Sequence, residues 1–299
     1  MDQEFKEMLK GMCPVVPRRV GVIAAEDANV LKAVLAAYDM GFAESVLFGN
    51  KDKIKKIADT YSIDISKFEI VNANDYLEAA AMAVAAVRSG RVDTLMKGLI
   101  HTADVLRAVL NRENGIRDDG FLSQVSVMHS IAKNQTLFLT DCVMVPYPDL
   151  QQKVELINNA VQCAKCFGIK VPKVAPLAAI EIINPKMPAT VEAAELTRMN
   201  QIGLIRDCVV DGPMALDGAI SVAAATKKGM KSSVAGQADV LLFHNIEAAN
   251  AVMKSMVYFG GFIFGSVVMG ARVPILLNSR SDTDVSKLFS IACAAKLNK

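Results

Sequence analysis

Short apolar runs alternate with longer stretches of helical periodicity along almost the whole chain, and this alternation constrains the fold more than any other feature. Residues 18–25 (RRVGVIAA) are mostly apolar, and residues 28–41 then place apolar side chains at helical spacing up to a glycine. Similar short runs recur at 43–49, 68–73, 92–98, 136–141, 173–179, 207–212, 238–245 and 274–279. Strands that alternate with helices in this way predict an α/β protein with mainly parallel sheets.

The chain is long enough for two domains. It has 299 residues, and a domain usually has ~150. Two prolines interrupt the alternation within residues 140–153, and a new strand–helix series begins there. We therefore expect the junction between two α/β domains near this segment.

Charge and hydropathy exclude several classes of function. The chain has 33 basic and 31 acidic residues, a net charge of +2, so it lacks the basic surface by which proteins bind nucleic acid or an anionic membrane. The most apolar window, residues 256–271, falls short of the ~20 residues that span a bilayer, and its glycines indicate a buried helix–turn–strand passage. We expect neither a nucleic-acid partner nor a membrane partner.

The six cysteines are scattered, and the N-terminus lacks the apolar core of a signal peptide. Cys163 and Cys166 form a CxxC, but it lies late in a helical pattern that ends near Gly168, and a second pair is missing. This pattern predicts free thiols and a cytoplasmic protein, with no zinc site.

Polar residues follow several predicted strands, where open α/β sheets bind their ligands. Residues 95–107 (LMKGLIHTADVLR) contain Lys97 and Gly98, then Thr102 as a predicted helix cap, and Arg107 about one turn into that helix. Helix amides, a hydroxyl and an arginine together suit a phosphate or carboxylate. A capped helix with solvated charges explains the same residues, so both interpretations stay open.

A second strand end has the same character. Residues 277–284 (LNSRSDTD) offer Ser279, Arg280 and Asp282 before a helix that Ser279 or Thr283 could cap. Ordinary capping is again the alternative to an anion site. Asp211 and Asn250 also follow predicted strands, where they could contact a ligand or brace a turn and a helix.

Common signatures of other chemistry are missing. The sequence contains neither GxxxxGK[ST] nor GxGxxG, and neither GxSxG nor HExxH. The three histidines are far apart in sequence, which gives no indication of a metal site.

Long motifs give the chain a resemblance to a known family. Residues 95–111, 175–196, 209–221, 231–259 and 270–292 resemble the phosphate acetyltransferase/phosphate butyryltransferase family. INPKMPAT (183–190) resembles the butyryltransferase branch more closely. The resemblance implies transfer of a short acyl group between coenzyme A and inorganic phosphate, with acyl-CoA as a substrate, no permanently bound cofactor and no metal.

The family resemblance also implies an architecture. It predicts two α/β domains with an interdomain cleft, similar to the isocitrate/isopropylmalate dehydrogenase-like fold, and a homodimer or an assembly of dimers. Because the C-terminal segment of such proteins returns to the first domain, we expect residues 1–140 plus 277–299 to form the first domain and residues 141–276 the second.

The resemblance assigns expected roles to a few residues. Ser279 matches a serine that interacts with the thiol or the tetrahedral centre, and Arg280 matches an arginine that binds phosphate. Arg107 matches an arginine implicated in phosphate or coenzyme A binding. The acetyltransferases carry an acidic base seven residues after the serine, where this chain has Ser286. Asp282 and Asp284 are therefore the nearer candidates, and the general base stays open.

We carry three alternatives to a butyryltransferase. A phosphate acetyltransferase differs only in its acyl pocket, and one methylene is worth only ~1–3 kcal/mol. A metal-dependent decarboxylating dehydrogenase on the same fold would need an aspartate cluster and a divalent metal. A phosphate- or acyl-CoA-binding module would bind without turnover.

Overall fold

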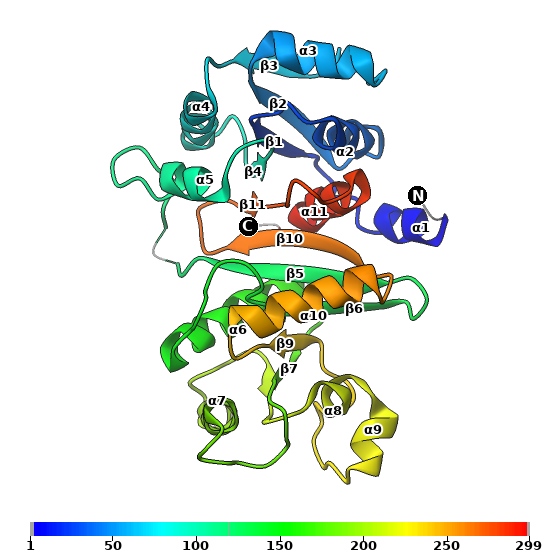
Figure 1. Ribbon diagram of the computed structural model, residues 1–299, viewed down its shortest axis with the longest axis vertical. Helices are drawn as coiled ribbons and strands as arrows, with labels where there is room; N and C mark the ends of the chain where they lie inside the picture. Colours follow the sequence, from blue (N-terminus) through cyan, green and yellow to red (C-terminus); the bar gives the residue numbers. More distant parts are fainter. Residues whose placement is uncertain (1–2, 119, 298–299) are drawn as a thin grey trace. The chain divides into compact units, whose positions relative to one another are not determined.

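The computed structural model describes residues 3–118 and 120–297, and its chain divides into two compact units (Figure 1). One comprises residues 1–122 and 263–299, and the other residues 123–262. The sequence-based boundaries lie at 140/141 and 276/277 instead. The difference arises because two hairpins, one at each crossing of the chain, keep their strands within one unit. The predicted first domain also includes residues 1–2, 119 and 298–299, which lie outside the described residues.

The first unit is built from both ends of the chain. In chain order its elements are α1 (Gln3–Lys10), β1 (Arg18–Ile23), α2 (Ala28–Asp39), β2 (Ala43–Gly49), α3 (Lys51–Thr60), β3 (Glu69–Asn72), α4 (Tyr76–Arg88), β4 (Thr94–Lys97), α5 (Thr102–Val109), β10 (Ile263–Met269), β11 (Ile275–Leu276) and α11 (Asp284–Lys296).

The sheet of this unit has the strand order β3-β2-β1-β4-β11-β10. The first five strands are parallel, and β10 runs antiparallel to β11. The helices α2 and α11 pack against each other on one face, and α4 and α5 on the other (Figure 1). β1 is buried over its last four residues and β4 over its whole length, as expected for strands covered on both faces.

The second unit is continuous in sequence. Its elements are β5 (Ser123–Ser130), β6 (Gln135–Thr140), α6 (Leu150–Cys166), β7 (Lys173–Pro176), α7 (Pro188–Gln201), β8 (Val209–Val210), α8 (Leu216–Ile220), α9 (Val222–Lys227), β9 (Val240–Leu242) and α10 (Ile246–Tyr258). Its strand order is β5-β6-β9-β7-β8. β5 and β6 form an antiparallel hairpin, and the remaining pairs are parallel. α6 packs against β5, β6 and β9.

Each unit therefore carries a mixed sheet that is mainly parallel, with one antiparallel pair, β10–β11 or β5–β6, in each. The predicted α/β class with mainly parallel sheets is confirmed. The apolar window is a helix–turn–strand passage, as predicted: α10 ends at Tyr258, Gly260 and Gly261 follow, and β10 begins at Ile263. Within the described residues, we find no helix long and apolar enough to cross a membrane.

Candidate functional site

The carboxyl ends of β1, β4 and β11 meet at one edge of the first unit's sheet. The register pairs Ile23 with Lys97 and Met96 with Leu276, so the three strands end level with one another. After β1 the chain builds β2 and β3 on one side, and it then crosses over to place β4 on the other side. This is the topological switch point at which open α/β sheets bind their ligands.

The loop after β11 is closed by the side chains at its two ends. Asn278 is buried, and its Nδ2 donates to Ser290 Oγ at 3.0 Å and to Asp282 Oδ2 at 3.3 Å. Asp282 Oδ2 also accepts the backbone amide of Ser279 at 2.7 Å. Thr283 caps α11 by accepting the Ser286 amide at 3.1 Å, so of the two predicted caps the structure uses Thr283.

Ser279 and Arg280 lie on the exposed side of this loop. The hydroxyl of Ser279 is 3.0 Å from that of Ser281. Arg280 makes no hydrogen bond or ion pair with any other residue in the part of the chain that the structure describes. Its guanidinium is therefore available to an anion.

Two buried lysines lie next to the loop. Lys287 is only 2% exposed, and its Nζ donates to the carbonyl oxygens of Ser279 at 3.1 Å and Asp282 at 2.6 Å. Burial lowers the pKa of Lys287, while the carboxylates of Asp27, Asp282 and Asp284 act in the opposite direction. Sequence reasoning missed Lys287, because most of the buried residues around it in α11 are apolar and give no indication of a site.

Lys97 closes β4 and is 5% exposed. Its burial lowers its pKa, and so do the neighbouring cations Arg280 and Lys287. Its Nζ donates to the Gly98 carbonyl oxygen at 3.3 Å. Gly98 is required here, because a Cβ at this position would lie 2.1 Å from the Ala24 carbonyl oxygen. Lys97, Arg280 and Lys287 thus form a cluster of three positive charges, which we call the cation cluster.

Two acidic residues follow β1, and sequence reasoning selected neither. Asp27 caps α2 by accepting the Val30 amide at 2.8 Å, and its charge influences both Lys97 and Lys287. Glu26 is buried; its Oε1 accepts the Asn50 amide at 2.8 Å, while Oε2 has no partner among the described residues. Their position directly after a predicted strand could have identified both as candidate site residues.

Tyr76 also lies near the cation cluster. Burial and the charge of Glu26 raise the pKa of its phenol, and Arg280 opposes them. Tyr76 is the first residue of α4, whose cap is Asp75. Both acidic and basic side chains therefore lie around the switch point of the first unit's sheet.

Thr102 and Arg107 are placed differently from the prediction. The structure begins α5 at Thr102, and His101 occupies the cap position without a side-chain cap bond, so Thr102 is not the cap. Arg107 is 71% exposed and forms an ion pair with Asp104. The structure shows no hydrogen bond or ion pair between Arg107 and the cation cluster.

Asp211 and Asn250 belong to the second unit. Asp211 directly follows β8 and is half-buried. Asn250 lies within α10, and its Nδ2 donates to the Cys142 carbonyl at 3.0 Å, which makes it a brace between α10 and the end of β6. No hydrogen bond joins Asp211 to Asn250.

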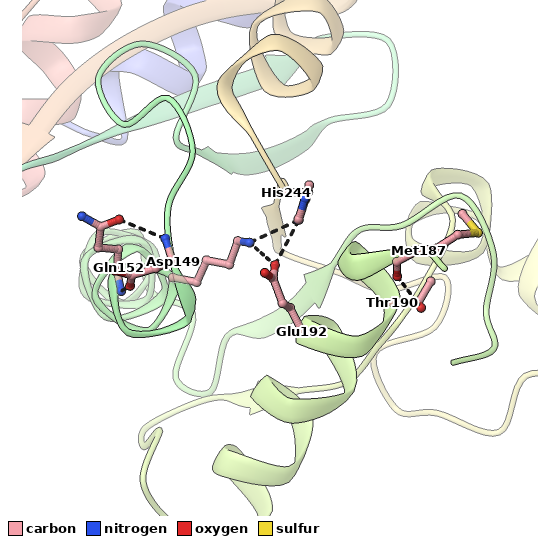
Figure 2. A network of polar contacts seen from close by, with 7 residues as sticks. Asp149, Gln152, Met187, Thr190, Glu192 and His244 are labelled. Atoms are coloured by element: carbon pink, nitrogen blue, oxygen red, sulfur yellow. Dashed lines mark hydrogen bonds and ion pairs between the residues drawn. The ribbon is translucent and has the colours of Figure 1, made fainter. Parts of the chain in front are cut away.

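A second polar cluster lies at the strand ends of the second unit. Figure 2 shows Glu192 of α7 and His244, which follows β9, meeting the ammonium of a buried lysine, Lys153 of α6. Lys153 Nζ is 3.2 Å from His244 Nδ1, and Glu192 Oε2 is 3.0 Å from the same nitrogen. In the described residues, no group of three or more His, Cys, Asp or Glu side chains could hold a metal ion.

Comparisons with known proteins agree on one family. The family model described as Phosphate acetyl/butaryl transferase matches residues 74–295. The chain is 43% identical to a phosphate butyryltransferase of Clostridium beijerinckii, over 99% of this chain and 98% of that protein. It is 40% identical to a phosphate acetyltransferase of Thermotoga maritima, over 97% and 99% of the two chains. The crystal structure of a branched-chain phosphotransacylase from Enterococcus faecalis V583 superposes with a TM-score of 0.84 at 30% identity, covering 94% and 98% of the chains.

Proposed function

The chain belongs to the Phosphate acetyl/butaryl transferase family, and on this premise we propose that it moves a short acyl group between coenzyme A and inorganic phosphate. The preferred reaction is butyryl-CoA plus phosphate giving butyryl phosphate plus coenzyme A. The observation that carries the proposal is the cation cluster beside the exposed Ser279 hydroxyl, at the switch point of the first unit's sheet.

Phosphate is held, in this proposal, by the Arg280 guanidinium, which faces solvent without a partner in the described chain. A guanidinium can bind two phosphate oxygens at once. Lys97 adds positive charge from a buried position next to Arg280. Because buried charges are poorly screened, the dianion gains more here than it would on an open surface.

The reaction is a direct transfer. A phosphate oxygen attacks the thioester carbonyl, the carbon–sulfur bond breaks, and the coenzyme A thiolate leaves and takes up a proton. In reverse, the thiolate attacks the acyl phosphate and phosphate departs. Ser279 Oγ donates to the oxyanion of the tetrahedral centre, and one such donor is worth about 10²–10³ in rate. No protein residue needs to carry the acyl group.

Deprotonation of the thiol needs assistance, because a coenzyme A thiol has a pKa of roughly 8.5–9.5, by analogy with cysteine. Asp282 is the nearest sequence candidate for this base, but one of its oxygens already holds the Ser279 amide. We therefore assign Asp282 to the loop and keep the cation cluster as the group that favours the thiolate. The remaining predicted contacts to phosphate or coenzyme A are Gly98, Thr102, Arg107, Asp211 and Asn250.

The finer predictions are part of this proposal. The isocitrate/isopropylmalate dehydrogenase-like fold with its interdomain cleft, the homodimer and the boundary at 276/277 rest on the family resemblance. The boundary at 140/141 rests on the two prolines, and the cytoplasmic location rests on the scattered cysteines and the N-terminal sequence. Coenzyme A enters as a substrate rather than as a bound cofactor in this proposal.

A second candidate is a phosphate acetyltransferase. The 40% identity to the Thermotoga maritima protein of that name supports it. The two candidates use the same site chemistry and differ in the room available to the acyl chain.

The test measures phosphate-dependent release of coenzyme A from acetyl-, propionyl- and butyryl-CoA. We expect the highest kcat/KM for butyryl-CoA, and a maximum at acetyl-CoA would favour the second candidate. Release that does not depend on phosphate, or no release from any of the three, would overturn the proposal. EDTA in one arm separates the metal-dependent dehydrogenase, whose turnover it would abolish.

A further inference from the structure

The backbone of the loop 279–283 is turned toward Lys287. Lys287 Nζ contacts the carbonyl oxygens of Ser279 and Asp282, 3.1 Å and 2.6 Å away. Both peptide bonds that follow these carbonyls are trans. In a trans peptide the C=O and the next N–H point in opposite directions. The amides of Arg280 and Thr283 are therefore directed away from Lys287.

These two amides are available for a ligand. In the described part of the chain, neither the Arg280 nor the Thr283 backbone N–H donates a hydrogen bond. The neighbouring amides are in use: the Ser279 N–H goes to Asp282 Oδ2, and the Asp282 N–H to the Ser279 carbonyl at 3.2 Å. Outward amides in a turn before a helix make a concavity that suits an anion.

We propose that Lys287 is the positioning residue of the phosphate loop: by holding the Ser279 and Asp282 carbonyls, it orients the Arg280 and Thr283 amides, which bind the phosphoryl group together with the Arg280 guanidinium. This rests on the proposed acyl transfer to phosphate. Lys287 itself does not touch phosphate, because its ammonium lies on the opposite side of the two peptide planes.

The burial of Lys287 supports this role over a purely structural one. A lysine that is 2% exposed costs free energy to bury, a cost that an uncharged methionine at the same position would not carry. The two carbonyl contacts and the nearby carboxylates of Asp27, Asp282 and Asp284 offset this cost only in part, since the pKa of Lys287 stays lowered. A role in fixing the loop geometry explains why a cation is buried at this position.

The test compares Lys287→Met with Lys287→Arg and with a matched control, Lys296→Met. Lys296 lies on the same helix and donates to a different carbonyl, that of Gly11. For Lys287→Met we expect the KM for phosphate to rise about 10–100-fold while the KM for acyl-CoA stays within about twofold. Lys287→Arg, which retains a cationic donor, should recover part of the loss, and the control should match wild type.

A direct binding measurement separates this inference from the proposed function. In wild-type protein labelled with ¹⁵N, titration with inorganic phosphate should shift the Arg280 and Thr283 amides, whether or not turnover is seen. Unshifted amides, or an unchanged phosphate KM in Lys287→Met, would overturn the role of Lys287 and leave an active enzyme intact. Shifted amides in a protein without turnover would contradict the acyl transfer but not the loop. If Lys287→Met does not fold, the phosphate titration of the wild-type protein and the phosphate KM of Lys287→Arg still test the role of Lys287.

Discussion

The carboxylate of Asp282 holds the backbone of Ser279, with Oδ2 2.7 Å from the Ser279 nitrogen. The same oxygen lies 3.3 Å from Asn278 Nδ2, so two donors converge on one atom. A carboxylate that braces a turn and one that takes a proton from a thiol respond differently to the loss of their charge. The brace needs only an oxygen acceptor, whereas the base needs a titratable group.

Asp282→Asn should therefore lower kcat/KM by less than about tenfold, because the amide oxygen can still accept the Ser279 N–H. Asp282→Ala removes the acceptor and should cost about 100-fold. The pH profile of kcat should keep its shape in the asparagine variant. Equal losses in both variants, together with a changed acidic limb, would instead make Asp282 the base.

Arg280 should matter for phosphate and hardly for stability. Arg280→Lys keeps the charge but loses the two-pronged geometry, so we expect kcat/KM to fall about 10²–10³-fold with a raised KM for phosphate. Its free energy of unfolding should change by less than about 0.5 kcal/mol, since the side chain is exposed. Arg112→Lys, at another exposed arginine of the first unit, is the matched control and should keep full activity. A normal phosphate KM in Arg280→Lys would remove Arg280 from the phosphate site.

We expect the wild-type Lys97 side chain to lower the free energy of unfolding while it supports activity. Burial and two neighbouring cations lower its pKa, and its Nζ has the Gly98 carbonyl 3.3 Å away. Lys97→Met should raise the free energy of unfolding by about 1 kcal/mol, measured by urea denaturation, and should lower kcat/KM at least tenfold. A variant that unfolds at lower urea than wild type would show that Lys97 is a net stabilising contact.

The buried thiols should be inert in the folded protein. Burial raises the pKa of Cys142 to about 12 and raises the pKa of Cys163 as well. At pH 8 the thiolate, which is the reactive form, is then a very small fraction of Cys142. Alkylation followed by mass spectrometry should modify the exposed Cys13 within minutes and these two only after unfolding. Rapid labelling of Cys142 in native protein would contradict the packing around the end of β6.

The polar cluster of the second unit should behave as a coupled unit. Glu192→Ala leaves the ammonium of Lys153 buried with His244 as its remaining partner. It should cost about 2–3 kcal/mol of stability, somewhat less than the usual ~3–5 kcal/mol because Glu192 is partly exposed. In Lys153→Met combined with Glu192→Leu, the loss should be below about 1 kcal/mol. Chemical denaturation of both proteins checks this, and a double variant that loses as much stability as Glu192→Ala would show that the two residues do not act as a pair.

Much of this architecture could be predicted from the sequence, because periodicity reflects local physics. The run 43–49 is the second strand of the structure with the same bounds. The helical pattern 28–41 is α2, and the glycine that ends it, Gly41, has a φ of +78° that favours glycine there. Helix caps were predicted less well. Thr102, the predicted cap of the helix after β4, is instead the first residue of α5, and His101 occupies the cap position without a side-chain hydrogen bond.

The features that were not predicted share a cause: they depend on contacts between residues that are distant in sequence, which a local pattern does not show. All eight residues of β5 are buried, polar ones included, and a hairpin rather than a helix connects it to β6, so neither polar–apolar alternation nor a following helix marks it. Lys287 was not predicted for a related reason. Its partners Ser279 and Asp282 contact it only after the loop has folded back onto α11. The strand-end rule did locate Lys97 and the 278–283 loop, because it depends on topology rather than on side-chain contacts.

The first unit joins β4 to β11, whose paired residues Leu95 and Ile275 come from opposite ends of the chain. During synthesis, residues 123–262 leave the ribosome complete while the sheet of the first unit still lacks β10, β11 and α11. The 279–283 loop and Lys287 follow the whole second unit in the chain. A nascent chain that still lacks them cannot assemble the proposed phosphate site, so we expect a product terminated before α11 to have no catalytic activity rather than a partial one.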